Sequence, residues 1–423
     1  MGKVLLASMS AGGGHHALRD SFHTALKLAD PDANRFETVA WDSSDQLINW
    51  FYSLCVHHLP RFQGQIYALS GRPWASALLA RLSPGLFLEA LRVLRRERPD
   101  AVISTHPLLT MMLVKAKHTL KLSTPVVAAI PDYGTPTAAF NPPKATLKPD
   151  FLVVMAEDTL RHYLEVEQVS PGQVHLSGFL TRAPFDAVGR ARQKTWGERG
   201  EQRAALLRTL ALTCPELGTL QPELPTVLFA GGSAWTEKTL PVLEKLLATP
   251  TTARAINVVV VCGRDTKFRD LLRRRHPARP QFAVVGHVPP DKYARVMGLA
   301  DLPVLGSLAP ASMQELLETR CGPLLLFSFI PGTEAPHAAY IEAERIGLHE
   351  PDAGKMLELL EQAVELKPAS ARLKAVMSGF AQRAEALRAA SVTRAHTLPD
   401  FVERVMDAST AHPRRAGRKS SVG

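Results

Sequence analysis

Short apolar runs alternate with longer amphipathic stretches along most of this chain, and this alternation predicts parallel α/β architecture. The strands predicted in the first half are Lys3–Ala7, Phe36–Ala40, Ala101–Thr105, Val126–Ile130, Phe151–Met155 and Val174–Ser177. Those predicted in the second half are Thr226–Ala230, Ile256–Val261, Phe282–Val285, Leu302–Leu305 and Pro323–Phe327. Because parallel sheets collect ligands at the carboxyl ends of their strands, two sheets facing across a cleft would each hold one ligand.

Length and composition divide this pattern into segments. A chain of 423 residues is too long for a single core and predicts two domains. The first is predicted over residues 1–185, with an aromatic insertion at 47–98, and a helix and linker follow at 186–224. The second is predicted over 225–350. Helices are expected at 351–409, and the basic tail at 410–423 has the composition of a disordered segment.

Charge and cysteine content narrow the classes of partner. The formal net charge of +10 favours anionic partners, such as a phosphate-bearing ligand, a nucleic acid or an acidic membrane face. No apolar run approaches the roughly 20 residues that a membrane-spanning helix needs, and the N-terminus does not read as a signal peptide. The four cysteines lie far apart, which argues against a metal site and predicts free thiols in the cytoplasm.

A glycine-rich run, Ala11-Gly-Gly-Gly-His-His16, directly follows the first predicted strand. The apolar spacing after it predicts a helix, so the glycines join a strand to a helix N-terminus. Free N–H groups and the helix dipole at such an end favour an anionic or strongly polar ligand. The histidines add groups that exchange protons near neutral pH. A tight turn with solvated histidines is the alternative, and the local pattern leaves both open.

The insertion breaks the alternation of strands and helices. It is rich in aromatic residues, such as Trp50, Tyr67 and Trp74, with arginines nearby, such as Arg72 and Arg81. Amphipathic rings and cations are both stable at a membrane interface. The same composition also fits the core of an ordinary helical insertion, so two interpretations remain.

Several segments, taken in order, resemble a known family. They are Ser10–His15, Pro99–Leu108, Val174–Phe185, Phe229–Ser233, Val261–Arg264, Val285–Val288, Pro310–Glu315 and Ile330–Glu334. The chain resembles the monogalactosyl- and diglucosyl-diacylglycerol synthase group of glycosyltransferases, which are relatives of the lipid-II N-acetylglucosaminyltransferase. The resemblance implies the GT-B fold, in which two Rossmann-like domains face each other across a cleft. It also implies metal-independent transfer from a sugar nucleotide.

The chain departs from the family pattern at three places. Ser233 replaces the glycine after Gly231-Gly232, and Ala139-Phe140-Asn141 stands where the family has a Trp-His pair. The family's Lys-x-Gly-Pro-Gly-Thr is Ser307-Leu-Ala-Pro-Ala-Ser312 in this chain, so a lysine and two glycines are replaced. Alanine still supplies a backbone N–H, although its methyl group narrows the approach of a ligand.

The resemblance assigns the acceptor side of the reaction to the first domain. When the acceptor hydroxyl displaces the diphosphate, a base must take the proton of that hydroxyl. In the family this base occupies the position of His15. Successive helical residues point about 100° apart, so His15 and His16 are not expected to face the cleft together. Asp132 is predicted to orient His15 or to bind the acceptor. Gly13, Gly14 and His106 are predicted to line the acceptor site.

The donor side is assigned to the second domain. Backbone N–H groups at the glycine loop and at the N-terminus of a helix are expected to cradle the diphosphate, and Glu315 to accept hydrogen bonds from the ribose. The main chain at Gly286 to Val288 is expected to hold a uracil base, and the loop around Glu334 to read the sugar hydroxyls. The predicted donor residues are Gly231, Gly232, Ser233, Arg264, Gly286, Val288, Ala311, Ser312, Glu315, Gly332, Thr333, Glu334 and His337.

Together with these residues, the resemblance implies an inverting, metal-independent hexosyltransferase that moves sugar from a UDP-sugar to a diacylglycerol-type lipid. No cofactor is expected, since the UDP-sugar is a co-substrate, and no nucleic acid. The protein is predicted to be cytoplasmic and peripheral on the anionic inner face of the cell membrane. Two alternatives remain. One is a GT-B enzyme with another acceptor, either a lipid-linked cell-wall intermediate or a metabolite. The other is a degenerate relative that binds nucleotide or lipid without turnover.

Overall fold

A computed structural model describes residues 1–9, 13–32, 34–43, 65, 69, 72–192, 200–232, 235–277 and 279–410. Several predictions fall outside these residues: Ala11 and Gly12 of the 11–16 run, Ser233, most of the insertion before residue 72, and the tail from residue 411.

The first sheet contains six parallel strands in the order β2-β1-β3-β4-β5-β6. They are β1 (Gly2–Met9), β2 (Phe36–Ser43), β3 (Ala101–Ser104), β4 (Val126–Ile130), β5 (Phe151–Val154) and β6 (Val174–Leu176). Its helices are α1 (Gly13–Ala29), α4 (Pro73–Arg81), α5 (Pro84–Glu97), α6 (Pro107–Leu120) and α7 (Glu157–Arg161). Leu5 and Ala7 of β1 pack with α5 and α6, whereas Val4 and Leu6 pack on the opposite face with α1. Both faces are buried, which explains the continuous apolar runs.

The second sheet also has six parallel strands, in the order β12-β11-β10-β7-β8-β9. They are β7 (Thr226–Ala230), β8 (Asn257–Gly263), β9 (Phe282–Gly286), β10 (Leu302–Leu305), β11 (Leu324–Leu326) and β12 (Gly347–His349). The helices around it are α10 (Leu240–Ala248), α11 (Pro250–Ala255), α12 (Thr266–Arg275), α13 (Pro290–Leu299), α14 (Pro310–Glu318), α15 (Ala335–Ala343) and α16 (Ala353–Ala363).

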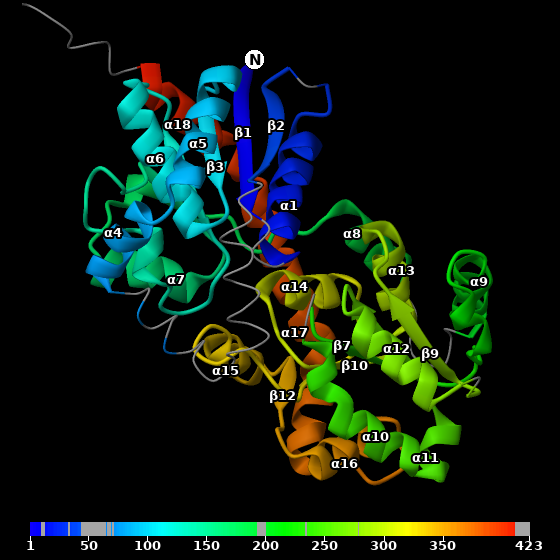
Figure 1. Ribbon diagram of the computed structural model, residues 1–423. Coiled ribbons are helices and arrows are strands. Elements are labelled where there is room, and N and C mark those ends of the chain that lie inside the picture. Colours follow the sequence, from blue (N-terminus) through cyan, green and yellow to red (C-terminus); the bar gives the residue numbers. More distant parts are fainter. Residues whose placement is uncertain are drawn as a thin grey trace, which may run out of the picture.

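Two segments connect the halves of the molecule (Figure 1). After β6 the chain enters α8 (Ala183–Ala191) and α9 (Gly200–Ala211), which both pack against α13 of the second half. Near the other end, α17 (Ala371–Ala395) contacts β12 and α14, and α18 (Leu398–Thr410) returns to cover the first sheet beside α1. The first domain's sheet therefore ends at Leu176, and α8 belongs by its packing to the second half.

All eleven predicted strands are present, with boundaries shifted by at most three residues. The sequence pattern missed β12, because its three residues are too few to show a period. Two parallel sheets of Rossmann-like order confirm the predicted α/β architecture.

Candidate active site

The predicted site residues follow the carboxyl ends of strands in both sheets. In each sheet the strand order reverses at one point, between β1 and β3 in the first and between β7 and β10 in the second. Loops on either side of such a point diverge and leave a crevice. Helix α1 begins at the first crevice and α14 at the second, and the two helices pack against each other (Figure 1). The two crevices therefore meet where the domains touch.

His15 lies in the first turn of α1 and faces the loop after β3. Its Nδ1 atom is 2.6 Å from the carbonyl oxygen of Thr105. A carbonyl only accepts hydrogen bonds, so Nδ1 carries the proton and Nε2 carries a lone pair. Nε2 has no partner among the described residues and is not enclosed. Burial lowers the pKa of His15 to about 4, and the neighbouring His16 adds to this shift. The imidazole is therefore neutral at pH 7, with a free basic nitrogen.

His16 points to the other side of α1, as the helical spacing predicts. Its Nδ1 atom lies 2.9 Å from both the Ser8 hydroxyl and an Asp42 carboxylate oxygen, and Arg19 also pairs with Asp42. This cluster joins the ends of β1 and β2. His16 is thus engaged in the wall of the sheet, whereas His15 faces the crevice.

His106 precedes α6 and lies against His15, with 4.8 Å between the ring centres. Its Nδ1 atom is buried and has no hydrogen-bond partner among the described residues. Burial lowers its pKa, so this ring is also uncharged at neutral pH. On the other side of the crevice, a Cβ atom built on Gly14 would meet no atom within 4 Å. His106 and Gly14 thus lie beside His15, with open space at Gly14. The predicted contact of Gly13 with the acceptor stays a prediction.

Asp132 follows β4 and meets the second domain rather than His15. Its carboxylate has no hydrogen-bond partner among the described residues. Burial and the negative charge of Glu334 raise its pKa to about 7. Since the Thr105 carbonyl already binds His15 Nδ1, the orienting role considered for Asp132 is filled by Thr105, and Asp132 is left as a candidate for contact with a substrate.

The next residue, Tyr133, is buried between the domains. Its ring stacks on Phe179 with 4.7 Å between ring centres, and it also contacts the rings of His337 and Tyr340 on α15. The hydroxyl approaches Met313 Sδ at 3.7 Å. An aromatic side chain of the first domain is thereby held between α14 and α15, which fixes Asp132 at the boundary.

The two glycines after β7 have different surroundings. A Cβ atom on Gly231 would collide with the backbone of Trp235 and Thr236, so this glycine permits a close turn. Gly232 has a φ of +64° and nothing within 4 Å of its Cβ position. A Cβ atom on Gly306, at the end of β10, would likewise collide with the backbone of Trp235. The first glycine therefore packs the loop, and the second borders open space at the crevice.

Helix α14 begins beside these glycines. Its N-cap residue, Ala309, has no side chain that can cap the helix, and Pro310 lacks an N–H. The first amides that the helix can offer to an anion are those of Ala311 and Ser312, whose residues are partly exposed. One turn further, Glu315 is buried and pairs with Arg182, whose Nε lies 2.9 Å from Oε1. Burial raises the pKa of Glu315 to about 7, and Arg182 opposes that rise.

Glu334 and His337 hold the loop that leads into α14. The Glu334 carboxylate accepts hydrogen bonds from the Ser307 hydroxyl at 2.7 Å and from the Leu308 and Ile330 amides at 3.0 and 2.9 Å. His337 Nδ1 lies 2.9 Å from the Leu308 carbonyl oxygen, and its Nε2 is buried without a partner among the described residues. Both side chains position the loop in this structure, and their predicted contacts with the sugar stay predictions.

The remaining donor candidates lie at the rim. Arg264 is exposed directly after β8, and Gly286 and Val288 lie at the end of the neighbouring edge strand β9. Thr333 and Gly332, which has a φ of +80°, precede Glu334. Sequence reasoning gave no role to Thr105, Tyr133 or Arg182. Only Arg182 carried a signal, because it lies within a family segment, whereas a backbone carbonyl such as that of Thr105 leaves no mark in a sequence.

The described end of the insertion exposes large apolar side chains. Trp74 and Leu78 of α4 and Leu82, which directly follows the helix, recur four residues apart and are 57%, 46% and 61% exposed. Arg72 and Arg81 flank them and are exposed as well. We call these three apolar residues the α4 stripe. These three side chains lie outside the core, whereas Ala80, Leu86 and Ala90 of the same insertion pack into it. The described part of the insertion therefore leaves both interpretations open.

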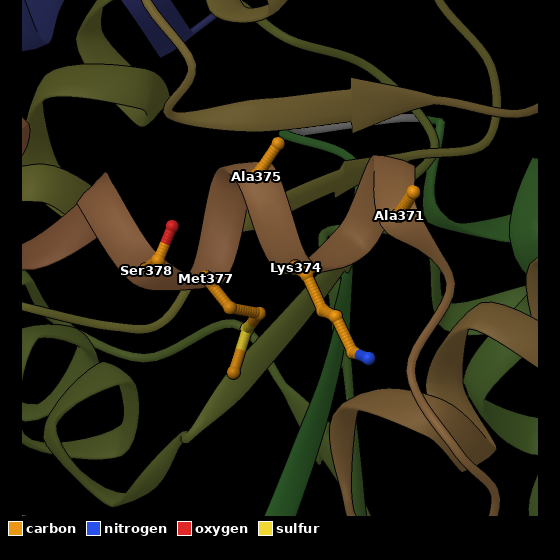
Figure 2. A pocket seen from close by; sticks show the side chains of 5 residues that line it. All are labelled: Ala371, Lys374, Ala375, Met377 and Ser378. Carbon is orange, nitrogen blue, oxygen red and sulfur yellow. The ribbon is translucent and has the colours of Figure 1, made fainter.

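A separate hollow of about 770 Å³ lies on α17 (Figure 2). It is lined by Ala371, Lys374, Ala375, Met377 and Ser378. All of them come from the first turns of one helix, and none was predicted as a site residue. Among the described residues, no helix has both the length and the apolar character that crossing a membrane requires.

Known proteins resemble this chain both in sequence and in structure. The family profile of monogalactosyldiacylglycerol (MGDG) synthase matches residues 33–178. The Oryza sativa subsp. indica protein named "Probable monogalactosyldiacylglycerol synthase 2, chloroplastic" is 25% identical over 364 residues, which cover 82% of this chain and 71% of that protein.

Solved structures share the architecture. The UDP-GlcNAc 2-epimerase of Neisseria meningitidis, bound to UDP-GlcNAc, has a TM-score of 0.55 at 14% identity and covers 92% of this chain and 100% of its own. The spinosyn rhamnosyltransferase SpnG has a TM-score of 0.54 at 13% identity, and the match covers 95% of this chain and 100% of that protein. The predicted family resemblance and GT-B fold are both confirmed. The chain is a glycosyltransferase of the GT-B fold and a relative of the monogalactosyldiacylglycerol synthases.

Proposed function

We propose that this glycosyltransferase transfers a hexose from a UDP-sugar to a diacylglycerol-type lipid, with inversion at the sugar carbon. The observation that carries the proposal is the state of His15. Its Nδ1–H donates to the Thr105 carbonyl, and its Nε2 is left free at the crevice where α1 meets α14. A neutral imidazole held in one tautomer is suited to general-base catalysis.

In the proposed reaction, Nε2 of His15 accepts the proton of the acceptor hydroxyl while the oxygen attacks the sugar carbon. The new carbon–oxygen bond forms opposite the diphosphate, and UDP leaves with the electron pair of the broken bond. The Thr105 carbonyl stabilises the positive imidazole that results, because Nδ1 continues to donate to it. The proton then passes from Nε2 to solvent. His106 and Asp132 are proposed to contact the acceptor.

The leaving diphosphate is proposed to bind at the N-terminus of α14. The amides of Gly232, Ala311 and Ser312 supply uncharged donors there, and the helix dipole adds positive potential. Glu315 is proposed to accept hydrogen bonds from the ribose, and the edge at Gly286 and Val288 to hold the base. Support comes from the Neisseria meningitidis structure, which binds a UDP-sugar. Metal independence is carried over from the family resemblance and is tested by assaying in the presence of a chelator.

The lipid acceptor is proposed to be reached at an anionic membrane surface. The relative from Oryza sativa is named for a diacylglycerol product, and the α4 stripe offers apolar groups next to arginines. Such side chains insert into the headgroup region while the cations contact anionic lipids. The inner face of the cell membrane is the proposed location. A chain with Ser307 in place of the family lysine is also compatible with nucleotide binding without turnover, which we keep as the second candidate.

One assay tests these proposals. Purified protein is incubated with vesicles containing diacylglycerol and with a panel of labelled UDP-sugars, and lipid products are resolved by thin-layer chromatography. We expect a labelled glycolipid from at least one donor, with the opposite anomeric configuration to that donor. UDP binding without transfer to any acceptor would favour the non-catalytic candidate. Transfer only to a water-soluble acceptor would contradict the lipid assignment.

A further inference from the structure

Arg182 occupies the segment in which the chain crosses between the domains. The first sheet ends at Leu176, and α8 begins directly after Arg182 and packs against α13 and α14. The packing of α8 is close, because a Cβ atom on Gly189 would collide with the Glu318 carbonyl of α14. The position of Arg182 relative to α14 is therefore set by the backbone.

The guanidinium of Arg182 holds one oxygen of Glu315. Nε donates to Oε1 at 2.9 Å, and Nη2 donates to the same oxygen. The guanidinium also lies over the Phe185 ring, 4.7 Å from its centre. The two side chains of the ion pair are 15% and 6% exposed. Hydrogen bonds and ring contact together leave this pair little freedom.

The second carboxylate oxygen of Glu315 is left available. Oε2 has no hydrogen-bond partner among the described residues, and it is not among their enclosed polar atoms. Glu315 lies one helical turn beyond Ser312, whose amide is one of those expected to bind the diphosphate. Oε2 is thus an acceptor within one turn of the proposed phosphate site.

Burial acts against the charge of this carboxylate. It raises the pKa of Glu315 to about 7, and the Arg182 cation is the group that opposes the rise. A protonated acid accepts weaker hydrogen bonds than a carboxylate does. Without the cation, Glu315 would be largely neutral at pH 7 and free to rotate.

We propose that Arg182 is a positioning residue of the donor site, which favours the charged form of Glu315 and presents its Oε2 to the ribose hydroxyls of the donor. This proposal rests on the proposed function, because it takes a UDP-sugar as the donor. Arg182 itself acts through Glu315 and does not touch the reacting atoms.

The test compares UDP binding by calorimetry and donor kinetics in variants. Arg182→Gln is expected to raise the Kd for UDP and the donor KM about tenfold at pH 7, which corresponds to about 1.4 kcal/mol. The kcat at saturating donor is expected to change less than threefold, because chemistry at His15 is untouched. Arg182→Lys keeps the positive charge but loses the planar guanidinium whose two nitrogens donate to Glu315, so an intermediate Kd for UDP is expected.

The matched control is Arg388→Gln. Arg388 pairs with Glu318, a second buried glutamate of α14, at 3.4 Å. This variant also leaves a buried carboxylate on α14 without its arginine, yet its UDP affinity is expected to equal that of the unchanged protein. If Arg182→Gln binds UDP normally, or if both variants weaken binding equally, the positioning role is wrong.

The pH dependence separates positioning from general destabilisation. In the unchanged protein UDP affinity should fall as the pH falls through about 7, where Glu315 gains its proton. In Arg182→Gln the unopposed burial raises the Glu315 pKa further, so the same fall in affinity should occur at a higher pH. Glu315→Gln should show no such dependence, and the double variant should bind no more weakly than the weaker single variant. An unchanged protein that binds no UDP would overturn the proposed function itself, whereas UDP binding insensitive to Arg182 would overturn only this inference.

Discussion

The Nδ1 atom of His15 and the carbonyl oxygen of Thr105 lie 2.6 Å apart, although 90 positions separate the residues in sequence. This contact fixes the tautomer of the imidazole and leaves Nε2 as the basic nitrogen. The group that orients His15 is an uncharged backbone carbonyl and not a carboxylate.

We expect His15→Ala to lower kcat about 10²- to 10⁴-fold, the usual contribution of a general base, with little change in the donor KM. Steady-state kinetics with the active UDP-sugar measures both. His23→Ala is the control, because His23 is an exposed histidine of the same helix whose Nδ1 contacts Thr38. Normal turnover in His15→Ala would remove this residue from the mechanism.

The His15 ring should titrate near pH 4 and not near 6.5, because burial disfavours its charged form. The base is then fully available from pH 8 down to about pH 5, and it is lost only as the pH falls through about 4. The ring resonances of His15, identified by their loss in His15→Gln, provide the measurement by NMR. A midpoint near 6.5 would contradict the effect of burial.

The two glycines after β7 should respond differently to alanine. Gly231→Ala should destabilise the fold by several kcal/mol, since the methyl group meets backbone atoms of Trp235 and Thr236. Gly232→Ala should cost about 1–2 kcal/mol for its left-handed conformation and should weaken UDP binding, because its Cβ enters the crevice. Urea unfolding and calorimetry with UDP distinguish the effects. Equal losses of stability would show that both glycines serve packing alone.

Tyr133 should stabilise the contact between the domains. Tyr133→Ala removes a fully buried ring and is expected to cost about 3–5 kcal/mol in urea unfolding. Tyr133→Phe keeps the stacking on Phe179 and loses only a weak contact with Met313, so it should cost less than about 1 kcal/mol. A Phe variant as unstable as the Ala variant would mean that the hydroxyl, and not the ring, holds the interface.

The α4 stripe should bind membranes. Replacing Trp74 and Leu78 together by serine is expected to reduce binding to anionic vesicles at least tenfold, since burial of each large side chain contributes about 1.5–3 kcal/mol. Vesicle sedimentation measures this, and UDP binding should be unchanged. Met377→Ser on α17 is the control, because it removes an exposed apolar group from the hollow in Figure 2. Equal loss in the control would contradict a specific role of the stripe.

The sequence by itself determined the architecture. Eleven of the strands, the order of two α/β halves and the strand-to-helix loops follow from local periodicity, because burial of both sheet faces imposes continuous apolar runs. The opposite directions of His15 and His16 follow from helix geometry in the same way. Family motifs placed the candidate residues at the correct sheet edges. Only β12 was too short for such reasoning.

The tertiary structure decided what each candidate side chain contacts. Arg182 pairs with Glu315, which lies 133 positions away in sequence, and Tyr133 packs between α14 and α15. The carboxylate of Glu334 binds the loop before α14. It also separated Gly231, which packs against Trp235, from Gly232, which borders open space. These facts depend on how two domains pack and on which polar groups lose water there. A local pattern carries no record of either, since both arise between residues distant in sequence.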